Sequence, residues 1–294
     1  MKNPIFKGCA TAIITPFTYD SIDLESFKKL IDLQIESGVN AIVVCGTTGE
    51  ASTMSRDERA QVIETAVQES GGRVPIIAGT GSNSTATAIE LSSDASKAGA
   101  DAFLVVTPYY NKATQSGLIH HFTQIADQTE KPVILYNVPS RTGISCTAET
   151  YLALSSHPNI LGVKEASGNL HLIQKTIDIC PEDFYVWSGN DDETASTMLL
   201  GGIGVISVVS NIAPRAMTKL TNACLTGKLH EAGELQIQLR ELAEALFCEV
   251  NPIPVKTALA MMGLCDEIFR SPMCAISAEN RTKLKNTLKR YDLL

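Results

Sequence analysis

The sequence predicts an α/β protein, a (β/α)8 barrel of the TIM type followed by a C-terminal helical extension. Two observations favour this class. Short apolar, β-branched runs alternate with segments of helical periodicity over about the first 210 residues, at a spacing near the ~30 residues of a βα unit. The runs are also almost continuously hydrophobic, which is typical of parallel strands that helices cover on both faces.

Eight of these runs are candidate strands. They lie at residues 10–15, 41–45, 75–79, 102–107, 132–137, 160–164, 184–188 and 203–208. Eight strands joined by helical crossovers fit a closed barrel better than the alternative, an open doubly wound sheet.

The segments between the first strands carry helix start and stop signals. Asp23 is expected to cap a helix that ends at Gly38. Ser55 and Glu58 have the spacing of a capping box at the start of the next helix, which the glycines at 71–72 should end.

The chain is expected to divide into a barrel, residues 1–213, and a C-terminal helical region, residues 214–294, that includes the last barrel helix. No strand-like run follows Pro214. The remainder has the pattern of several helices, broken at Gly227 and at the proline-rich segment 251–254.

Composition excludes several classes of protein. The chain has 294 residues, 44% of them hydrophobic, so it can bury a large core. A formal net charge of −8 argues against binding to nucleic acid. No apolar run approaches the ~20 residues of a membrane helix, and the first residues lack the apolar core of a signal peptide, so we expect a cytoplasmic protein with no membrane partner.

The eight cysteines are scattered singly, without a CxxC pair. Reduced core thiols are the favoured interpretation, and disulfides or metal ligands are the alternative. We expect neither a metal nor a cofactor.

Chemistry in such a barrel takes place at the carboxyl ends of the strands. The residues that follow the predicted strands are rich in glycine, hydroxyl groups and amides, with one lysine. They are residues 15–16, 46–50, 79–81, 107–111, 136–137, 164–165 and 188–190, together with Ser207. This composition favours a polar mouth without the carboxylate or histidine cluster of a metal site.

Lys164 is the most informative of these residues because it ends the apolar run 160–163. Burial there should lower the pKa of its amine, and a neutral amine is the nucleophile that forms a Schiff base with a carbonyl substrate. The alternative is a strand-end lysine that extends to solvent or pairs with Glu165.

Other strand-end residues suggest anion binding and proton transfer. The Gly-Thr-Thr-Gly-Glu segment 46–50 could hold a carboxylate with hydroxyls and backbone amides, or it could be an ordinary tight turn. Arg141 could bind a carboxylate at the rim or form a surface ion pair. Tyr110 and Tyr136 could relay protons or hold substrate, although for either tyrosine alone a structural role is the favoured interpretation.

Seven motifs, taken together, resemble the dihydrodipicolinate synthase / N-acetylneuraminate lyase superfamily over nearly the whole length. They are GTTGE (46–50), TPYYN (107–111), YNVPSRTG (136–143), GVKEAS (162–167), SGND (188–191), GVIS (204–207) and NPIPVK (251–256).

The resemblance implies that Lys164 forms a Schiff base with pyruvate, which then condenses with L-aspartate 4-semialdehyde. The product would be 4-hydroxy-tetrahydrodipicolinate, in the diaminopimelate route to lysine, formed without metal or cofactor. Tyr136 would shuttle protons, coupled to Thr47 and to Tyr110. In the family the residue matching Tyr110 crosses the tight-dimer interface into the neighbouring subunit's site, so the resemblance also implies a homotetramer built as a dimer of dimers.

The resemblance assigns substrate-binding roles as well. Thr48, with Thr47 and their backbone amides, would hold the pyruvate carboxylate, and Arg141 would take the carboxylate of the aldehyde. The backbones of Gly189 and Ile206 would line the site.

Two other functions remain as alternatives. The first is a lyase acting on N-acetylneuraminate or a 2-keto-3-deoxy-sugar acid, whose segment usually lacks an arginine at the position of Arg141. The second is a catalytically silent barrel that binds 2-oxo acids for regulation. It is disfavoured because Lys164, Tyr136, Thr47 and Tyr110 are all present.

Feedback inhibition by lysine is predicted to be weak or absent. Asn83 and Tyr109 match the effector pocket of sensitive relatives. However, Thr87 stands where that pocket has an acidic residue, and Arg56 stands where a histidine is common. The lysine ammonium would therefore lose a partner and meet a like charge.

Overall fold

The computed structural model describes all 294 residues and confirms the predicted barrel. Eight parallel strands follow one another around the barrel in chain order, and pairing of the last strand with the first closes it. This closure excludes the open sheet. The strands are β1 (Gly8–Ala12), β2 (Ala41–Val44), β3 (Ile76–Gly79), β4 (Ala102–Val106), β5 (Val133–Asn137), β6 (Ile160–Glu165), β7 (Tyr185–Ser188) and β8 (Gly204–Ser207).

The predicted bounds of the first strand, 10–15, were wrong. The strand β1 covers Gly8–Ala12, and the chain then leaves the ladder although it stays buried. The main-chain N–H of Ile14 donates to the Asn211 side chain at 3.1 Å, and the Thr15 hydroxyl donates to the carbonyl of Gly49 at 2.8 Å. Hydrophobicity continues past the strand end because burial continues, so an apolar run alone could not locate that end.

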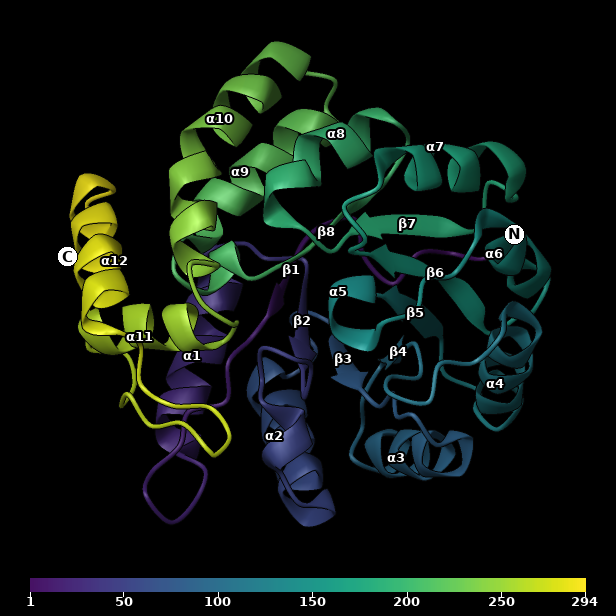
Figure 1. The fold of residues 1–294 in the computed structure, drawn as a ribbon, viewed down its shortest axis with the longest axis horizontal. Helices are drawn as coiled ribbons and strands as arrows, with labels where there is room; N and C mark the ends of the chain where they lie inside the picture. The colour runs from purple at the N-terminus through teal and green to yellow at the C-terminus, as the bar shows by residue number, and fades with distance from the viewer.

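Twelve α-helices surround the barrel or extend it (Figure 1). They are α1 (Leu24–Glu36), α2 (Arg56–Ser70), α3 (Thr85–Lys97), α4 (Gln115–Asp127), α5 (Pro139–Thr142), α6 (Ala148–Ser155), α7 (Leu170–Ile179), α8 (Thr194–Leu199), α9 (Pro214–Leu225), α10 (Leu229–Leu246), α11 (Ile253–Met261) and α12 (Ala278–Arg290). Three short 3-10 helices accompany them: η1 (Ala51–Thr53), η2 (Asp191–Glu193) and η3 (Val209–Asn211).

The predicted helix signals act as expected. The Asp23 carboxylate accepts the N–H of Ser26 at the start of α1. Ser55 and Glu58 form the reciprocal capping box of α2, and Gly71 ends that helix in the left-handed conformation, with φ of 55°. Each signal satisfies backbone groups that a helix end leaves without partners.

Four helices follow β8. The first, α9, packs against β1 and β8 on the outside of the barrel, and α10 packs against α9. The last two, α11 and α12, contact each other and α10, and Figure 1 shows them beside α1, away from α4 and α6. This arrangement brings the segment that joins α10 to α11 to the barrel mouth. None of the helices is long and apolar enough to cross a membrane.

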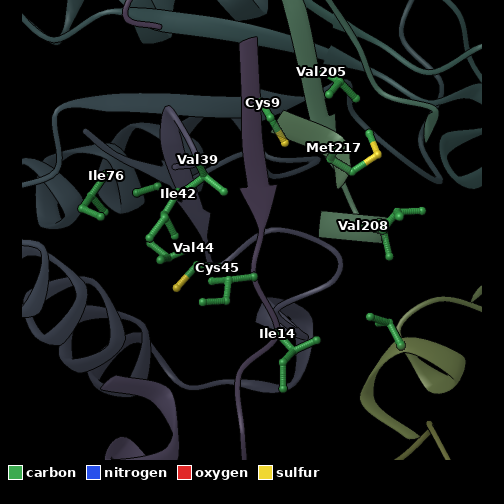
Figure 2. Close-up of a cluster of buried hydrophobic side chains, with 14 of the residues drawn as sticks. Cys9, Ile14, Val39, Ile42, Val44, Cys45, Ile76, Val205, Val208 and Met217 are labelled. Atoms are coloured by element: carbon green, nitrogen blue, oxygen red, sulfur yellow. The ribbon is translucent and has the colours of Figure 1, made fainter. Parts of the chain in front are cut away.

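The core has two layers because successive side chains of a strand point to opposite faces. Cys9, Ile42 and Val44 face outward and pack beneath the helices, in the larger cluster drawn in part in Figure 2. Ala10 and Val43, from the same strands, face inward. The barrel interior is thus filled with side chains, and space for a ligand remains at its mouth.

Strand register places the two groups predicted to carry the chemistry next to each other. Tyr136 of β5 pairs with Lys164 of β6, which in turn pairs with Trp187 of β7. Neighbouring residues at one level of a barrel point to the same side, so the phenol and the amine both face inward.

Candidate active site

A cavity of about 200 Å³ lies at the carboxyl ends of the strands. It brings together six residues that the sequence singled out: Thr47, Thr48, Tyr136, Arg141, Lys164 and Gly189. They come from strands, loops and one short helix between residues 47 and 189, close to half of the chain. The fold therefore assembles most of the predicted site within one chain.

Lys164 is buried in this cavity, with 5% of its surface exposed. Its Nζ lies 4.5 Å from the centroid of the Tyr136 ring. Burial lowers the pKa of Lys164 from 10.5 to about 8; the Asp191 carboxylate opposes this change, and the Arg141 guanidinium adds to it. The direction is the one predicted, and it makes the amine a better nucleophile near neutral pH.

Both alternatives considered for Lys164 are excluded by its surroundings. The side chain does not extend to solvent. Glu165 lies on the opposite face of β6, where its carboxylate accepts hydrogen bonds from Asn137 Nδ2 at 2.9 Å and from the hydroxyl of Tyr151 at 2.7 Å. The Glu165 carboxylate therefore does not pair with the Lys164 amine.

Tyr136 is nearly buried, and burial raises the pKa of its phenol. The Arg141 charge and the nearby Thr47 side chain act in the opposite direction. The phenol therefore stays protonated at neutral pH and has a hydroxyl neighbour. Such a pair can pass a proton to or from a substrate bound at Lys164.

The 46–50 segment is both a tight turn and part of the cavity wall. Its main-chain N–H at Glu50 donates to the carbonyl of Thr47 at 3.1 Å, and Glu50 has a positive φ of 54°. Thr48 is buried, and its hydroxyl oxygen accepts a hydrogen bond from Asn251 Nδ2 at 3.0 Å. The segment is therefore a tight turn, and its position in the cavity wall also allows it to bind a carboxylate.

Arg141 lies on α5, the single turn that follows β5, with an exposed side chain that lines the cavity. Its guanidinium donates to the carbonyl of Asn251 at 3.2 Å, rather than to a carboxylate. Its remaining donors can therefore bind an anionic ligand, because an arginine carries five N–H groups.

Gly189 follows β7 and packs against the lysine. A Cβ added there would lie 2.5 Å from the Cβ of Ala166 and 3.1 Å from Cε of Lys164. Any larger residue would push against the Lys164 side chain, so glycine is required for this close approach.

Two predicted site residues are not brought to this cavity. Ile206 lies on β8 with its side chain in the barrel interior, and the cavity is lined by Val208 instead. Tyr110 lies in the loop after β4, 92% exposed and with φ of 72°. It does not line the cavity that holds Tyr136.

Sequence reasoning assigned no role to a buried ion pair beneath the 46–50 turn. Lys256 of α11 is fully buried and pairs with Glu50. Its ammonium also donates to the carbonyl of Ile268 at 3.1 Å and lies 4.2 Å from the centroid of the Phe17 ring. Glu50 and Lys256 each belong to a motif that the sequence shows, but nothing in the sequence near either residue predicts that they pair.

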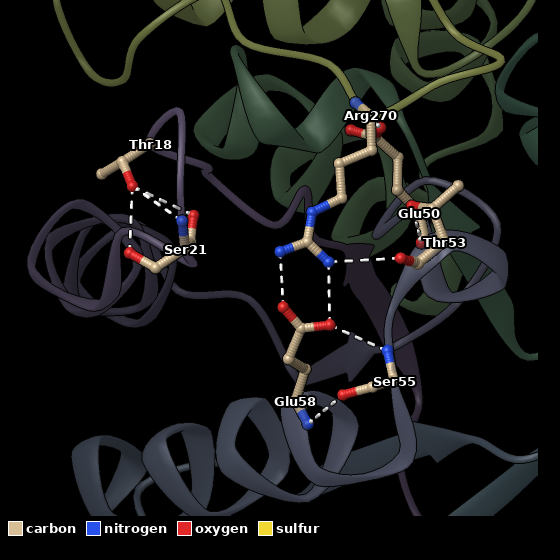
Figure 3. Close-up of polar contacts among 7 residues, drawn as sticks. All are labelled: Thr18, Ser21, Glu50, Thr53, Ser55, Glu58 and Arg270. Atoms are coloured by element: carbon tan, nitrogen blue, oxygen red, sulfur yellow. Dashed lines mark hydrogen bonds and ion pairs between the residues drawn. The ribbon is translucent and has the colours of Figure 1, made fainter.

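A second ion pair, between Arg270 and Glu58, lies beside the same turn, as Figure 3 shows. The Arg270 guanidinium binds the Glu58 carboxylate and donates to the carbonyl of Thr53 at 3.2 Å, while its main-chain N–H approaches Glu50 at 3.4 Å. The segment after α11 thus holds the turn in place.

Asp191 joins two loops of the site. One of its carboxylate oxygens accepts the main-chain N–H groups of Val208 at 2.9 Å and Val209 at 3.1 Å. Burial raises its pKa, and its charge faces Lys164. It fixes the loop after β7 to the loop after β8.

Comparison with known proteins shows the family of the chain. The family model described as the Dihydrodipicolinate synthetase family matches residues 5–291. The 4-hydroxy-tetrahydrodipicolinate synthase of Thermoanaerobacter sp. (strain X514) is 49% identical over 292 residues, which cover 99% of this chain and 98% of the relative. The enzyme of the same name from Geobacter sulfurreducens is 48% identical over 290 residues, covering 99% of this chain and all of the relative.

A solved structure has the same fold. The dihydrodipicolinate synthase of Thermotoga maritima superposes with a TM-score of 0.98 at 43% identity, covering 99% of this chain and 100% of that one. Because the family model and these relatives match over nearly the whole length, the protein belongs to the dihydrodipicolinate synthetase family.

Proposed function

We propose that the protein condenses pyruvate with L-aspartate 4-semialdehyde through a Schiff base on Lys164, giving 4-hydroxy-tetrahydrodipicolinate. One observation carries the proposal: a buried lysine amine with a lowered pKa lies beside Tyr136, in a cavity that also holds Thr47, Thr48 and Arg141. The names of the full-length relatives support the choice of reaction.

The lowered pKa makes Lys164 available as a nucleophile. With a pKa of about 8, roughly one amine in ten is neutral at pH 7, against about three in ten thousand for a pKa of 10.5. The neutral amine attacks the pyruvate carbonyl carbon. Loss of the carbonyl oxygen as water leaves a protonated imine.

The imine then acts as an electron sink. A proton leaves the pyruvate methyl group, and the resulting enamine carbon forms a bond to the aldehyde carbon of the second substrate. The aldehyde oxygen takes up a proton and becomes the hydroxyl of the product. Tyr136, with its Thr47 partner, is the group placed to move these protons.

Two anion sites would orient the substrates. The hydroxyls and backbone amides at Thr47 and Thr48 would bind the pyruvate carboxylate beside Lys164. Arg141, at the rim, would bind the carboxylate of the aldehyde. Gly189 leaves the room that the Lys164 side chain needs. Val208, just after β8, takes the place in the cavity wall that was predicted for the Ile206 backbone.

Tyr110 would complete the proton relay from a neighbouring subunit. The exposure of Tyr110 supports this role. Its backbone is in the left-handed region and its phenol extends into solvent, where a second chain could contact it. The assembly would be a homotetramer built as a dimer of dimers. Light scattering and the activity of a Tyr110→Phe variant test this part.

Lysine should inhibit the enzyme weakly or not at all. The Arg56 guanidinium already binds Asp94 and Glu90, and Thr87 offers no charge to an ammonium group. Turnover measured with up to millimolar lysine should stay near its uninhibited rate. Clear suppression at or below that concentration would contradict the prediction.

The decisive experiment is intact-mass analysis after incubation with pyruvate and borohydride, followed by peptide mapping. We expect one adduct per chain at Lys164 and none in a Lys164→Met variant. Coupled assays with L-aspartate 4-semialdehyde and with N-acetylmannosamine then identify the acceptor. Folded protein that forms no adduct would overturn the assignment, and turnover with N-acetylmannosamine alone would replace the condensation with the sugar-acid lyase activity.

A further inference from the structure

Asn251 is a buried residue at the start of the segment that leads into α11, and it lines the active-site cavity. It contacts both proposed anion sites. Its Nδ2 donates to the Thr48 hydroxyl at 3.0 Å, and its main-chain oxygen accepts a hydrogen bond from Arg141 at 3.2 Å. Asn251 therefore lies between the two carboxylate-binding groups.

One polar atom of Asn251 has no partner. Its side-chain oxygen, Oδ1, is buried and accepts no hydrogen bond from any group of the protein. Burying an amide oxygen without a donor costs free energy, and most buried polar groups in proteins avoid it. An unpaired acceptor on a residue that lines a substrate cavity points to a ligand that brings the donor.

We infer that Asn251 determines specificity for the second substrate, by accepting a hydrogen bond at Oδ1 from the amino group of the aldehyde. This inference rests on the proposed function. An α-amino acid carries its amino group on the carbon next to its carboxylate. If Arg141 binds that carboxylate, the amino group lies beside Asn251, whose backbone Arg141 contacts directly.

The other groups of the cavity are less suited than Asn251 to accept a hydrogen bond from the substrate amino group. No carboxylate lines the cavity. The second asparagine there, Asn190, is half-buried, so solvent can donate to its Oδ1, and its Nδ2 donates to Glu193 at 2.9 Å. Two acceptors near the site are buried and unpaired, Oδ1 of Asn251 and Oδ1 of Asp191, and of these two residues only Asn251 lines the cavity.

A neutral acceptor also suits the last step of the reaction. The substrate amine must lose its extra proton before it attacks the imine carbon on Lys164. The attack gives a carbon bonded to both nitrogens. A proton passes from the substrate nitrogen to Nζ, the bond from that carbon to Nζ then breaks, and Lys164 leaves as a free amine. A carboxylate would hold the amino group as ammonium, whereas an amide oxygen can orient the free amine.

Two aldehydes distinguish this role from simple support of the site. Succinate semialdehyde has the carbon chain and carboxylate of L-aspartate 4-semialdehyde but no amino group. Carbon–carbon bond formation with each aldehyde, at saturating pyruvate, gives two values of kcat/KM for each variant. Asn251→Leu should lower the value for the amino aldehyde by about ten- to hundredfold, the size expected for one lost hydrogen bond to a charged or strongly polar group. The value for succinate semialdehyde should change much less.

Matched variants and a trapping assay complete the test. Asn222→Leu makes the same change at an exposed position of α9 and should leave the ratio of the two values unchanged. Asn251→Asp keeps an oxygen acceptor and should keep the preference for the amino aldehyde in carbon–carbon bond formation, which comes before the amine must lose its proton. This variant covers the case in which Asn251→Leu does not fold. An equal loss for both aldehydes in Asn251→Leu, or loss of the preference in Asn251→Asp, would overturn the inference. Failure of the proposed function looks different, because wild-type protein would then trap no pyruvate with borohydride.

Discussion

Replacing Lys164 with methionine should make the folded protein more stable while abolishing the Schiff base. Methionine is unbranched and of similar length, so it takes the place of the lysine in its neutral form. The variant removes the free energy needed to keep a protonated amine in a buried site.

The size of the effect follows from the pKa of Lys164, which burial lowers from 10.5 to about 8. The unfolded chain binds the Lys164 proton more tightly than the folded protein does, and the difference corresponds to about 3 kcal/mol. Because the folded pKa lies below the unfolded one, the wild-type protein carries this whole deficit below about pH 8 and recovers it progressively towards pH 10.5. The variant should therefore be more stable by about 3 kcal/mol at pH 7 and by about 2 kcal/mol at pH 9.

Urea unfolding at these two pH values measures the difference. Trp187 is the only tryptophan and is fully buried in the barrel interior, so its fluorescence reports loss of the barrel. Protein concentration is held constant because assembly contributes to apparent stability. Lys285→Met, an exposed position on α12, is the matched control and should change stability little at either pH.

Two results would refute the reasoning. The variant could be no more stable than the wild type at pH 7, or its advantage could fail to narrow by pH 9. Either result would mean that burial does not hold the pKa of Lys164 near 8. A lowered pKa could then not explain why Lys164 acts as a nucleophile.

Three further predictions concern the same site. The rate of pyruvate trapping should rise from pH 6 to about 8 and then level off, because only neutral Lys164 reacts; a rate independent of pH in this range would contradict the lowered pKa. Glu50→Gln should destabilise the protein by about 3–5 kcal/mol in urea unfolding, since it leaves Lys256 charged and unpaired in the interior. Adding Lys256→Met should recover most of that loss, and simple addition of two losses would argue against the pair. Gly189→Ala should slow trapping by about a hundredfold with an unchanged circular dichroism spectrum, because the new methyl group lies 3.1 Å from Cε of Lys164; trapping at the wild-type rate would refute the steric argument.

Some of the site could be predicted because it depends on local sequence. Lys164 ends an apolar strand, and the carboxyl ends of all strands in a barrel meet at one mouth, so counting strands places it there. The caps at Asp23 and Ser55 depend on residues three positions away, and they too could be read directly.

Other parts depend on contacts between segments far apart in the chain. Glu50 and Lys256 are 206 residues apart, and nothing near either one shows that they pair. The role inferred for Asn251 depends on its contacts with Thr48 and Arg141. These contacts form only when the segment before α11 lies across the barrel mouth.

The sequence by itself determined the eight-stranded barrel, the position of Lys164 and the ends of the first helices, because hydrophobic periodicity and helix caps act within a few residues. The tertiary structure decided which polar groups share one cavity, which of them are already paired and which acceptor is left for a substrate. Burial and hydrogen-bond partners are properties of the packed chain, so they appear only when distant loops are brought together.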